Sequence, residues 1–367
     1  MKKFCSLLLV LCMTTTAWSY DFKVGKLYYK ITGRAINQTV EVTYQKHRSK
    51  ENYAGLTEVA IPPTVKYKGV TYMVTGISEF AFFECSSLKS ISIPSTVTSI
   101  GGWAFTSSGI MDQEANWKNK LLCIDGCLIK VQEDIYGACV VKEDVRLIGN
   151  RAFADCYYLT SVTLPPSVKN IGKETFSKCS HLRSIILPEQ LKTIGNNAFT
   201  GCSQLQSIVL PESLQSVGSN AFEGCTMLQS VVIPAGVTTV NRSLFAGCQS
   251  LQSVQLHDRV TIVGEMAFDR CASLQQVVVP TGVTNIGYRT FAGCTALTTI
   301  TLPNTLSSLG QYVLDGCQNL QRIVYLGTTS EWKKMYKDVS WNRNAPRIEV
   351  QCTDGNLVVD DKTRALL

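Results

Sequence analysis

Cysteine is the residue of this 367-residue chain with the most chemistry to offer, because a thiol can form a disulfide, ligate a metal or act as a nucleophile. Fifteen are present, and eight recur at a constant interval of 23 residues: Cys156, Cys179, Cys202, Cys225, Cys248, Cys271, Cys294 and Cys317. Equivalent residues of neighbouring repeats point the same way, whereas a disulfide needs converging Cβ atoms. The three histidines, His47, His181 and His257, are too scattered to complete a metal site. We therefore expect small buried apolar groups with free thiols at these eight positions.

Motifs for other chemistry are missing from the sequence. It contains no G-x-S-x-G, H-E-x-x-H, phosphate-binding glycine loop or C-x-x-C. Three histidines leave little for acid–base catalysis, and acidic residues such as Glu189, Glu212 and Glu223 occupy differing registers, as solvated surface charges do. We expect a non-catalytic protein, with no catalytic residue, no metal ligand and no cofactor.

The spacing of the cysteines belongs to a repeat, C-x-x-L-x-x-[IV]-x-[LIV]-P-x-x-[LV]-x-x-[IVL]-G-x-x-A-F-x-x. A self-similar period of 20 to 29 residues is typical of a stacked solenoid. Alternation over residues 205–210 predicts a short strand, and the following proline ends it. Gly218 permits a corner, and Ala221 and Phe222 are predicted to fill the interior, with phenylalanines stacking from coil to coil. One coil cannot bury its own apolar edge, but neighbours ~4.8 Å apart can.

Degraded copies of the repeat precede the strict array. Cys85 belongs to a clear copy, and Tyr136, Cys139 and Val141 are predicted to occupy the Leu, Ile/Val and Leu registers of another. Between these copies, residues 107–135 form an insertion in which two apolar runs flank Asp125-Gly126, which predicts a hairpin. Disulfides among Cys123, Cys127 and Cys139, or one using Cys352, remain open at this point.

The two ends of the chain break the 23-residue pattern. Residues 1–19 combine a basic start, a short apolar run and small residues before a cleavage point after Ser19, which predicts a signal peptide; a lipid on Cys12 is the alternative. Residues 20–75 alternate as strands of an N-terminal β cap, and residues 322–367 are predicted to be a C-terminal cap and tail, leaving 76–321 as the solenoid. Trp332 and Trp341 are expected to pack over the last coil; the alternative is an exposed ligand platform.

The charge excludes one class of partner. Without the two leader lysines the net charge is +5, and the chain has no run of five like charges, so we expect no nucleic acid as partner. No later window is apolar enough for a transmembrane segment. The chain is therefore expected to be exported, as a secreted or cell-surface protein, with the periplasm as a further possibility.

The unit Leu-x-x-Ile-x-Leu-Pro followed by Ile-Gly-x-x-Ala-Phe-x-x-Cys resembles the BspA-like leucine-rich repeats of exported Bacteroides-group proteins, over roughly residues 59–326. Residues 70–75 and 327–332 resemble the entry and closing segments of that family. Cysteine lies before the first leucine instead of in the later Asn/Cys slot, which favours this subfamily over receptor types. The resemblance implies a mainly β fold, a curved right-handed leucine-rich-repeat solenoid with a cap at each end, and binding of proteins, with adhesion in some members.

Outward positions of the predicted main strand form columns that are candidates for ligand binding. The candidate residues are Arg183, Ile186, Gln206, Val209, Gln229, Val232, Gln252, Gln275 and Val278. A column of amides beside an apolar stripe suits contact with a protein or glycan, although stacked amides and β-branched side chains also stabilise a ladder without any ligand. We expect a monomeric, adhesin-like binder of host or bacterial surface proteins. The alternative is a periplasmic or surface spacer without a specific ligand.

Overall fold

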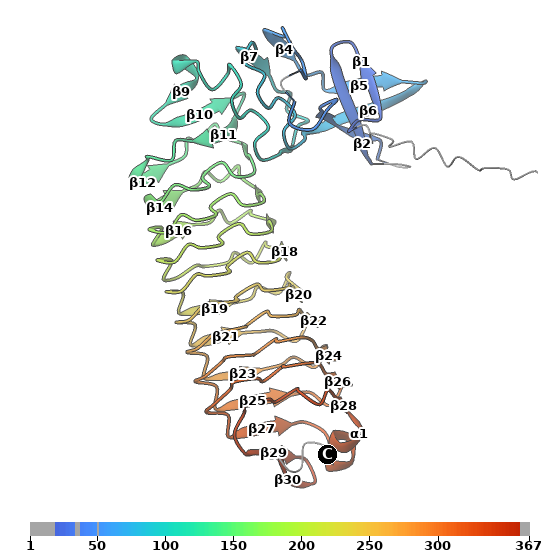
Figure 1. Cartoon of the computed structure of the whole chain (residues 1–367), viewed down its shortest axis with the longest axis vertical. Coiled ribbons are helices and arrows are strands. Elements are labelled where there is room, and N and C mark those ends of the chain that lie inside the picture. Colours follow the sequence, from blue (N-terminus) through green and yellow to red (C-terminus); the bar gives the residue numbers. More distant parts are fainter. Residues whose placement is uncertain (1–18, 34–36, 50, 360–367) are drawn as a thin grey trace, which may run out of the picture.

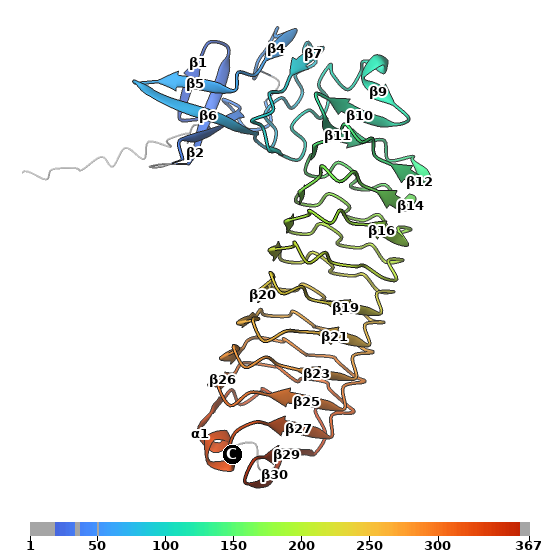
Figure 2. The same cartoon turned by 180° about the vertical axis from the view of Figure 1, so that it is seen from behind.

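Stacked 23-residue coils build an elongated column, with a sheet of different design at its N-terminal end (Figure 1). The computed structural model describes residues 19–33, 37–49 and 51–359. Seen from behind, the coils lie in sequence order from the N-terminal sheet to the C-terminal end (Figure 2). The protein is mainly β, as the repeat predicts, and it is a solenoid. Residues 1–18, which include Cys12, lie outside the described residues. Cleavage after Ser19 and a lipid on Cys12 therefore stay predictions.

The N-terminal sheet is made by chain segments that alternate between apolar and polar side chains. Its strands, in sheet order, are β1 (Phe22–Val24), β2 (Leu27–Gly33), β3 (Thr39–Thr43), β6 (Val70–Ile77) and β5 (Thr64–Tyr67), and β8 (Ser99–Ile100) of the first coils pairs with β6. Phe22 of β1 stacks on Tyr67 of β5 at 4.3 Å between ring centroids, so the two edges of the sheet approach each other. A separate parallel pair, β4 (Glu58–Ala60) and β7 (Ser90–Ser92), lies beside this sheet.

The predicted hairpin around Asp125-Gly126 is confirmed, and it lies between two hydrophobic cores. The short 3-10 helix η1 (Glu114–Asn116) and strand β9 (Trp117–Lys118) lead into β10 (Leu121–Ile124), which pairs antiparallel with β11 (Cys127–Val131); β11 then pairs with β13 (Leu147–Ile148). Leu121 and Leu128 belong to the core of the repeat array, whereas Leu122 and Cys127 belong to the N-terminal core. Because strand side chains alternate between faces, one short hairpin serves both cores.

Two parallel ladders run along the array. The main ladder contains β12 (Tyr136–Val140), β14 (Tyr158–Thr163), β16 (Ser184–Ile186), β19 (Ser230–Val232), β21 (Ser253–Gln255), β23 (Gln276–Val278), β25 (Thr299–Leu302), β27 (Arg322–Tyr325) and β29 (Ile348–Cys352), to which β30 (Gly355–Val359) adds antiparallel. The second ladder contains β15 (Asn170–Ile171), β17 (Thr193–Ile194), β18 (Ser216–Val217), β20 (Thr239–Val240), β22 (Ile262–Val263), β24 (Asn285–Ile286), β26 (Ser308–Leu309) and β28 (Tyr336–Lys337). Neither ladder is continuous in the middle of the array.

Two details of the repeat prediction are wrong. Residues 205–210 form no regular strand, so β16 and β19 are the nearest main-ladder strands on either side of this coil. Tyr136 does not occupy a leucine register: it aligns with Tyr158 and is 80% exposed. Gly137 adopts a positive φ, and the register of β12 shifts after it, which turns Tyr136 outward while Cys139 and Val141 stay buried as predicted.

The interior of the array is built from the phenylalanines and cysteines of the repeat. Successive rings from Phe153 to Phe291 stack with centroids 4.8 to 5.6 Å apart, which confirms the predicted stacking. All eight periodic cysteines are buried. Their thiols have a further role that spacing did not indicate: the Cys225 Sγ donates to the carbonyl oxygen of Phe199 at 3.3 Å, and the Cys248 Sγ to that of Phe222 at 3.2 Å. The thiol therefore joins each coil to the one before it.

The C-terminal segment covers its tryptophans. Helix α1 (Thr329–Lys334) begins with a capping box in which the Glu331 N–H donates to Thr328 Oγ1 and the Thr328 N–H donates to the Glu331 carboxylate. Trp332 and Trp341 are buried and meet edge to face at 6.0 Å, so the expectation of packing is confirmed and neither ring is an exposed platform.

Candidate interaction surface

All nine candidate residues are exposed on the outside of the main segments of their coils; Gln206 and Val209 belong to the coil that has no regular main-ladder strand. The aliphatic members lie at the last residue of their coil's main segment, with 68% of Ile186, 82% of Val209, 56% of Val232 and 62% of Val278 exposed. Strand register aligns this column, since Thr163 pairs with Ile186, Val232 with Gln255 and Val278 with Thr301. Four coils thus present an aliphatic side chain to solvent on one face.

The glutamines of the neighbouring column leave their amides available. Among the described residues, no hydrogen bond joins the side chains of Gln206, Gln229, Gln252 and Gln275 to one another. The amides therefore do not form a hydrogen-bonded stack that would explain their presence by stability alone. Arg183 is the one charged member among the nine candidates, so this face offers amide donors and acceptors beside apolar surface.

Sequence reasoning missed the N-terminal end of this surface. Tyr136, Val140 and Tyr158 are 80%, 70% and 60% exposed, and they lie on β12 and β14 next to the column of Ile186. The Tyr158 ring approaches the His181 ring at 5.9 Å. Tyr158 could have been found from the repeat, because it lies two residues after Cys156 at a solvent position. Tyr136 could not, because the shift after Gly137 changes its register.

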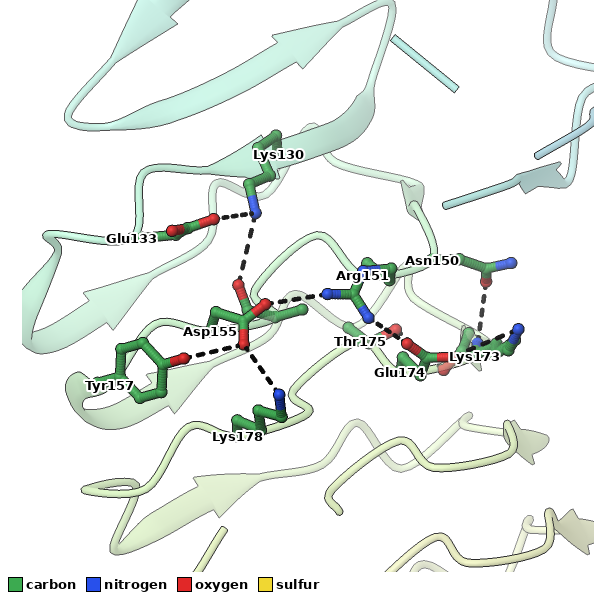
Figure 3. Close-up of polar contacts among 12 residues, drawn as sticks. Lys130, Glu133, Asn150, Arg151, Asp155, Tyr157, Lys173, Glu174, Thr175 and Lys178 are labelled. Carbon is green, nitrogen blue, oxygen red and sulfur yellow. Dashed lines mark hydrogen bonds and ion pairs between the residues drawn. The ribbon is translucent and has the colours of Figure 1, made fainter. Parts of the chain in front are cut away.

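A dense group of charges lies where the insertion meets the strict array (Figure 3). Arg151 donates to Asp155 at 2.9 Å and also to Glu174 of the next coil, while Lys130 contacts Glu133 at 3.2 Å. Tyr157 donates to Asp155 at 3.2 Å, and this carboxylate raises the pKa of the tyrosine. Each carboxylate already has a cationic partner, so the group ties coils together and offers no unpaired acid or base for catalysis.

Two of the histidines contact main-chain carbonyl oxygens of a neighbouring coil. His181 Nδ1 lies 2.7 Å from the carbonyl oxygen of Tyr157, and His257 Nε2 lies 3.0 Å from that of Pro234. In the part of the chain that the structure describes, no three His, Cys, Asp or Glu residues are grouped to hold a metal ion. Across the same residues, no helix has the length and apolar character needed to span a bilayer.

A family model for the BspA type leucine-rich repeat region matches the chain in six copies, over residues 52–125, 137–251 and 215–336. The chain belongs to this family. Membership of this family agrees with the observed coils, which are mainly β and have cysteine before the first leucine. Leucine-rich repeat proteins are typically scaffolds for interaction with other proteins, using the extended surfaces that stacked repeats create.

Solved structures with similarity to the BspA-type chain come from several bacteria. A leucine-rich repeat protein from Bacteroides ovatus is 26% identical, with 89% of this chain and 99% of that chain covered and a TM-score of 0.43. A leucine-rich cell surface protein from Faecalibacterium prausnitzii is 22% identical, with 86% and 97% covered and a TM-score of 0.32. The pneumococcal vaccine antigen PcpA is 16% identical, with 88% and 97% covered and a TM-score of 0.40. A comparison with curated proteins gives no match.

Proposed function

We propose that the protein is an exported, adhesin-like scaffold that binds a protein on a host or bacterial surface through the outside of its main ladder. The observation that carries the proposal is the uncharged strip in which exposed aliphatic side chains run beside unpaired glutamine amides, from Ile186 to Val278. Such a strip suits protein contact because apolar surface contributes to affinity and amides add directional hydrogen bonds. The exposed Tyr136 and Tyr158 extend it with a residue type that is enriched among binding hot spots.

Export and the terminal caps belong to the same proposal. The leader pattern of residues 1–19 supports secretion or surface location. Residues 20–75 and 322–367 would then cover the two ends of the array, which otherwise leave strand edges open to other chains. Protease treatment of intact cells tests the location: loss of the protein supports outward exposure, and full protection supports the periplasmic spacer instead.

The binding face is tested with the mature chain as bait against host matrix and cell-surface fractions. Once a partner is captured and purified, Gln229→Glu with Val232→Lys should abolish its binding, because a charge then replaces an amide contact and an apolar contact. The matched control is Gln215→Glu with Ile262→Lys, which makes comparable changes at an exposed residue directly before β18 and at an exposed residue of β22. Unchanged binding by the first variant, or equal loss by both, would reject the main ladder as the binding face.

A further inference from the structure

A groove of about 940 Å³ lies in the N-terminal part of the protein, away from the surface proposed above. One wall is made by β4 and its neighbour β7, and the other by the hairpin of β1 and β2 together with the start of β5. Leu27, Tyr29, Val65 and Ile91 line it as buried apolar side chains. The groove therefore combines an apolar lining with an exposed strand.

The wall formed by β4 has an unpaired edge. Its partner is β7, to which Thr57 contributes its carbonyl oxygen and Ile61 its N–H group. Because main-chain groups of a parallel strand alternate between its two sides, Glu58 and Ala60 direct theirs away from β7. Among the described strands, β7 is the one that pairs with β4, so this outer edge can accept a further strand.

Lysines on the opposite wall have no acidic partner. Lys26 and Lys66 line the groove, and Lys23 and Lys68 lie on the same two hairpins, all of them exposed. No carboxylate of the described residues lies within 4.0 Å of their ammonium groups. Glu58 is the single acid lining the groove. The charge is regional: residues 20–77 hold nine Lys and Arg against four Asp and Glu, whereas residues 78–367 hold 24 of each.

We propose that this groove binds an extended acidic segment of a partner protein, which adds to the open edge of β4. Side chains of an added strand alternate between two faces, so one set would contact the apolar lining and the other would meet Lys26 and Lys66. The segment that fits therefore alternates apolar and acidic residues. Main-chain hydrogen bonds to Glu58 and Ala60 would supply affinity, and the lysines would supply the preference for acids.

Fluorescence anisotropy of the mature chain with three probes tests the proposal. The first is a labelled ten-residue peptide of alternating valine and glutamate. The second is the same peptide with alternate amides N-methylated, which removes donors for strand addition. The third is labelled dextran sulfate, which carries negative charge without a polypeptide backbone. We expect the first probe to bind, the second to bind at least ten-fold more weakly, and the third not to bind at this groove.

Variants locate the binding. Lys26→Glu with Lys66→Glu should weaken the first probe at least ten-fold, whereas Lys169→Glu with Lys333→Glu, with the same change of net charge at exposed positions elsewhere, should not. Ala60→Pro removes only an N–H that points away from β7, a position where an edge strand tolerates proline, and should weaken binding without lowering the melting temperature. Equal binding by the N-methylated peptide or by Ala60→Pro would overturn strand addition. Binding of dextran sulfate alone would overturn the polypeptide as ligand and indicate an anionic polysaccharide.

Discussion

Residues 20–77 and residues 156–317 differ in architecture and in the balance of their charges. The N-terminal stretch carries nine basic and four acidic residues, whereas the longer strict array carries nine and eight. In the array, coils stack in register, so each residue lies directly against its equivalent in the next coil. A charge repeated in one column would repel its neighbours ~4.8 Å away, which favours serine, glutamine and aliphatic residues on the strands.

The N-terminal sheet is free of this constraint. Its strands come from unrelated segments joined mostly by hairpins, so Lys23 and Lys26 need not face copies of themselves. It also has its own core, of which Tyr29 and Val42 are part, while the array from Phe153 onward belongs to a second core. The comparison teaches that repetition stabilises the array at the cost of charge diversity, whereas the irregular sheet can present a charged, specific groove.

Raising the pH above 9 should produce the largest difference in stability between the array and the N-terminal sheet. Burial raises the pKa of Cys156, Cys248 and Cys317 from 9.0 to about 12. The folded thiols hold their protons while unfolded ones ionise, so their stabilisation is complete below pH 9 and is lost as the pH rises toward 12. By pH 10 each of these three thiols lowers the free energy of unfolding by about 1.4 kcal/mol relative to its contribution below pH 9. The N-terminal core contains two cysteines, Cys85 and Cys127.

Hydrogen–deuterium exchange at pH 8 and pH 10, corrected for the intrinsic rate, checks this prediction. We expect the array to lose protection at a lower pH than the N-terminal sheet. Cys225→Ala removes one of the buried thiols, so it should reduce the pH-dependent loss of stability of the array by the contribution of one thiol. Earlier loss of protection in the N-terminal sheet would contradict the assignment of the effect to the stacked thiols.

Phe222→Ala should destabilise the array by about 3 to 5 kcal/mol, the usual cost of truncating a buried phenylalanine. The ring stacks on Phe199 and Phe245 at 5.4 and 5.6 Å, so both neighbouring coils lose a contact. Denaturant unfolding measures the loss. Exchange protection of the N-terminal sheet should remain, and Phe22→Ala should give the opposite pattern. Equal loss in both regions for either variant would show that the two cores unfold as one unit.

Arg270→Gly should stabilise the array by about 1 kcal/mol. Arg270 has φ +57 at a corner where neighbouring coils have Gly247 and Gly293, also at positive φ. A side chain is strained in this conformation, and the ion pair lost, with Asp269, comes from an arginine side chain that is 72% exposed. A change in the opposite sense at the equivalent corner of another coil, Gly224→Ala, should lower the melting temperature. A fall with Arg270→Gly would show that this ion pair outweighs the backbone strain.

The smallest effect concerns the coil without a regular main strand. Amides of residues 207–209 should exchange faster than those of β19, because this coil lacks the regular strand pairing that β19 makes with β21. The second ladder is also interrupted here, since Asn241 replaces the repeat glycine and its side chain donates to the carbonyl oxygen of Val217. Equal exchange would indicate that the coil is held as firmly as its neighbours.

Much of the architecture follows from the sequence because the repeat places chemically equal residues in equal environments. The buried cysteines, the stacked phenylalanines and the exposed columns of Gln229 and Val232 could all be predicted from one unit. Prediction failed at two places. At Tyr136 the unit is imperfect, and one glycine at positive φ shifted the register; at residues 205–210 the unit is ideal, yet it formed no regular strand. Local alternation does not specify hydrogen bonds with a neighbouring coil.

The eight periodic cysteines by themselves determined the period, and the period determined a stacked solenoid with thiols inside. Tertiary structure decided what the thiols do, since the carbonyl oxygen that each of Cys179 to Cys317 contacts lies 26 residues earlier, in another coil. It likewise decided that the β10–β11 hairpin lies between two cores, and that β4 has an open edge beside Lys26 and Lys66. These features depend on contacts between segments with no shared pattern, and periodicity carries information only about segments that repeat.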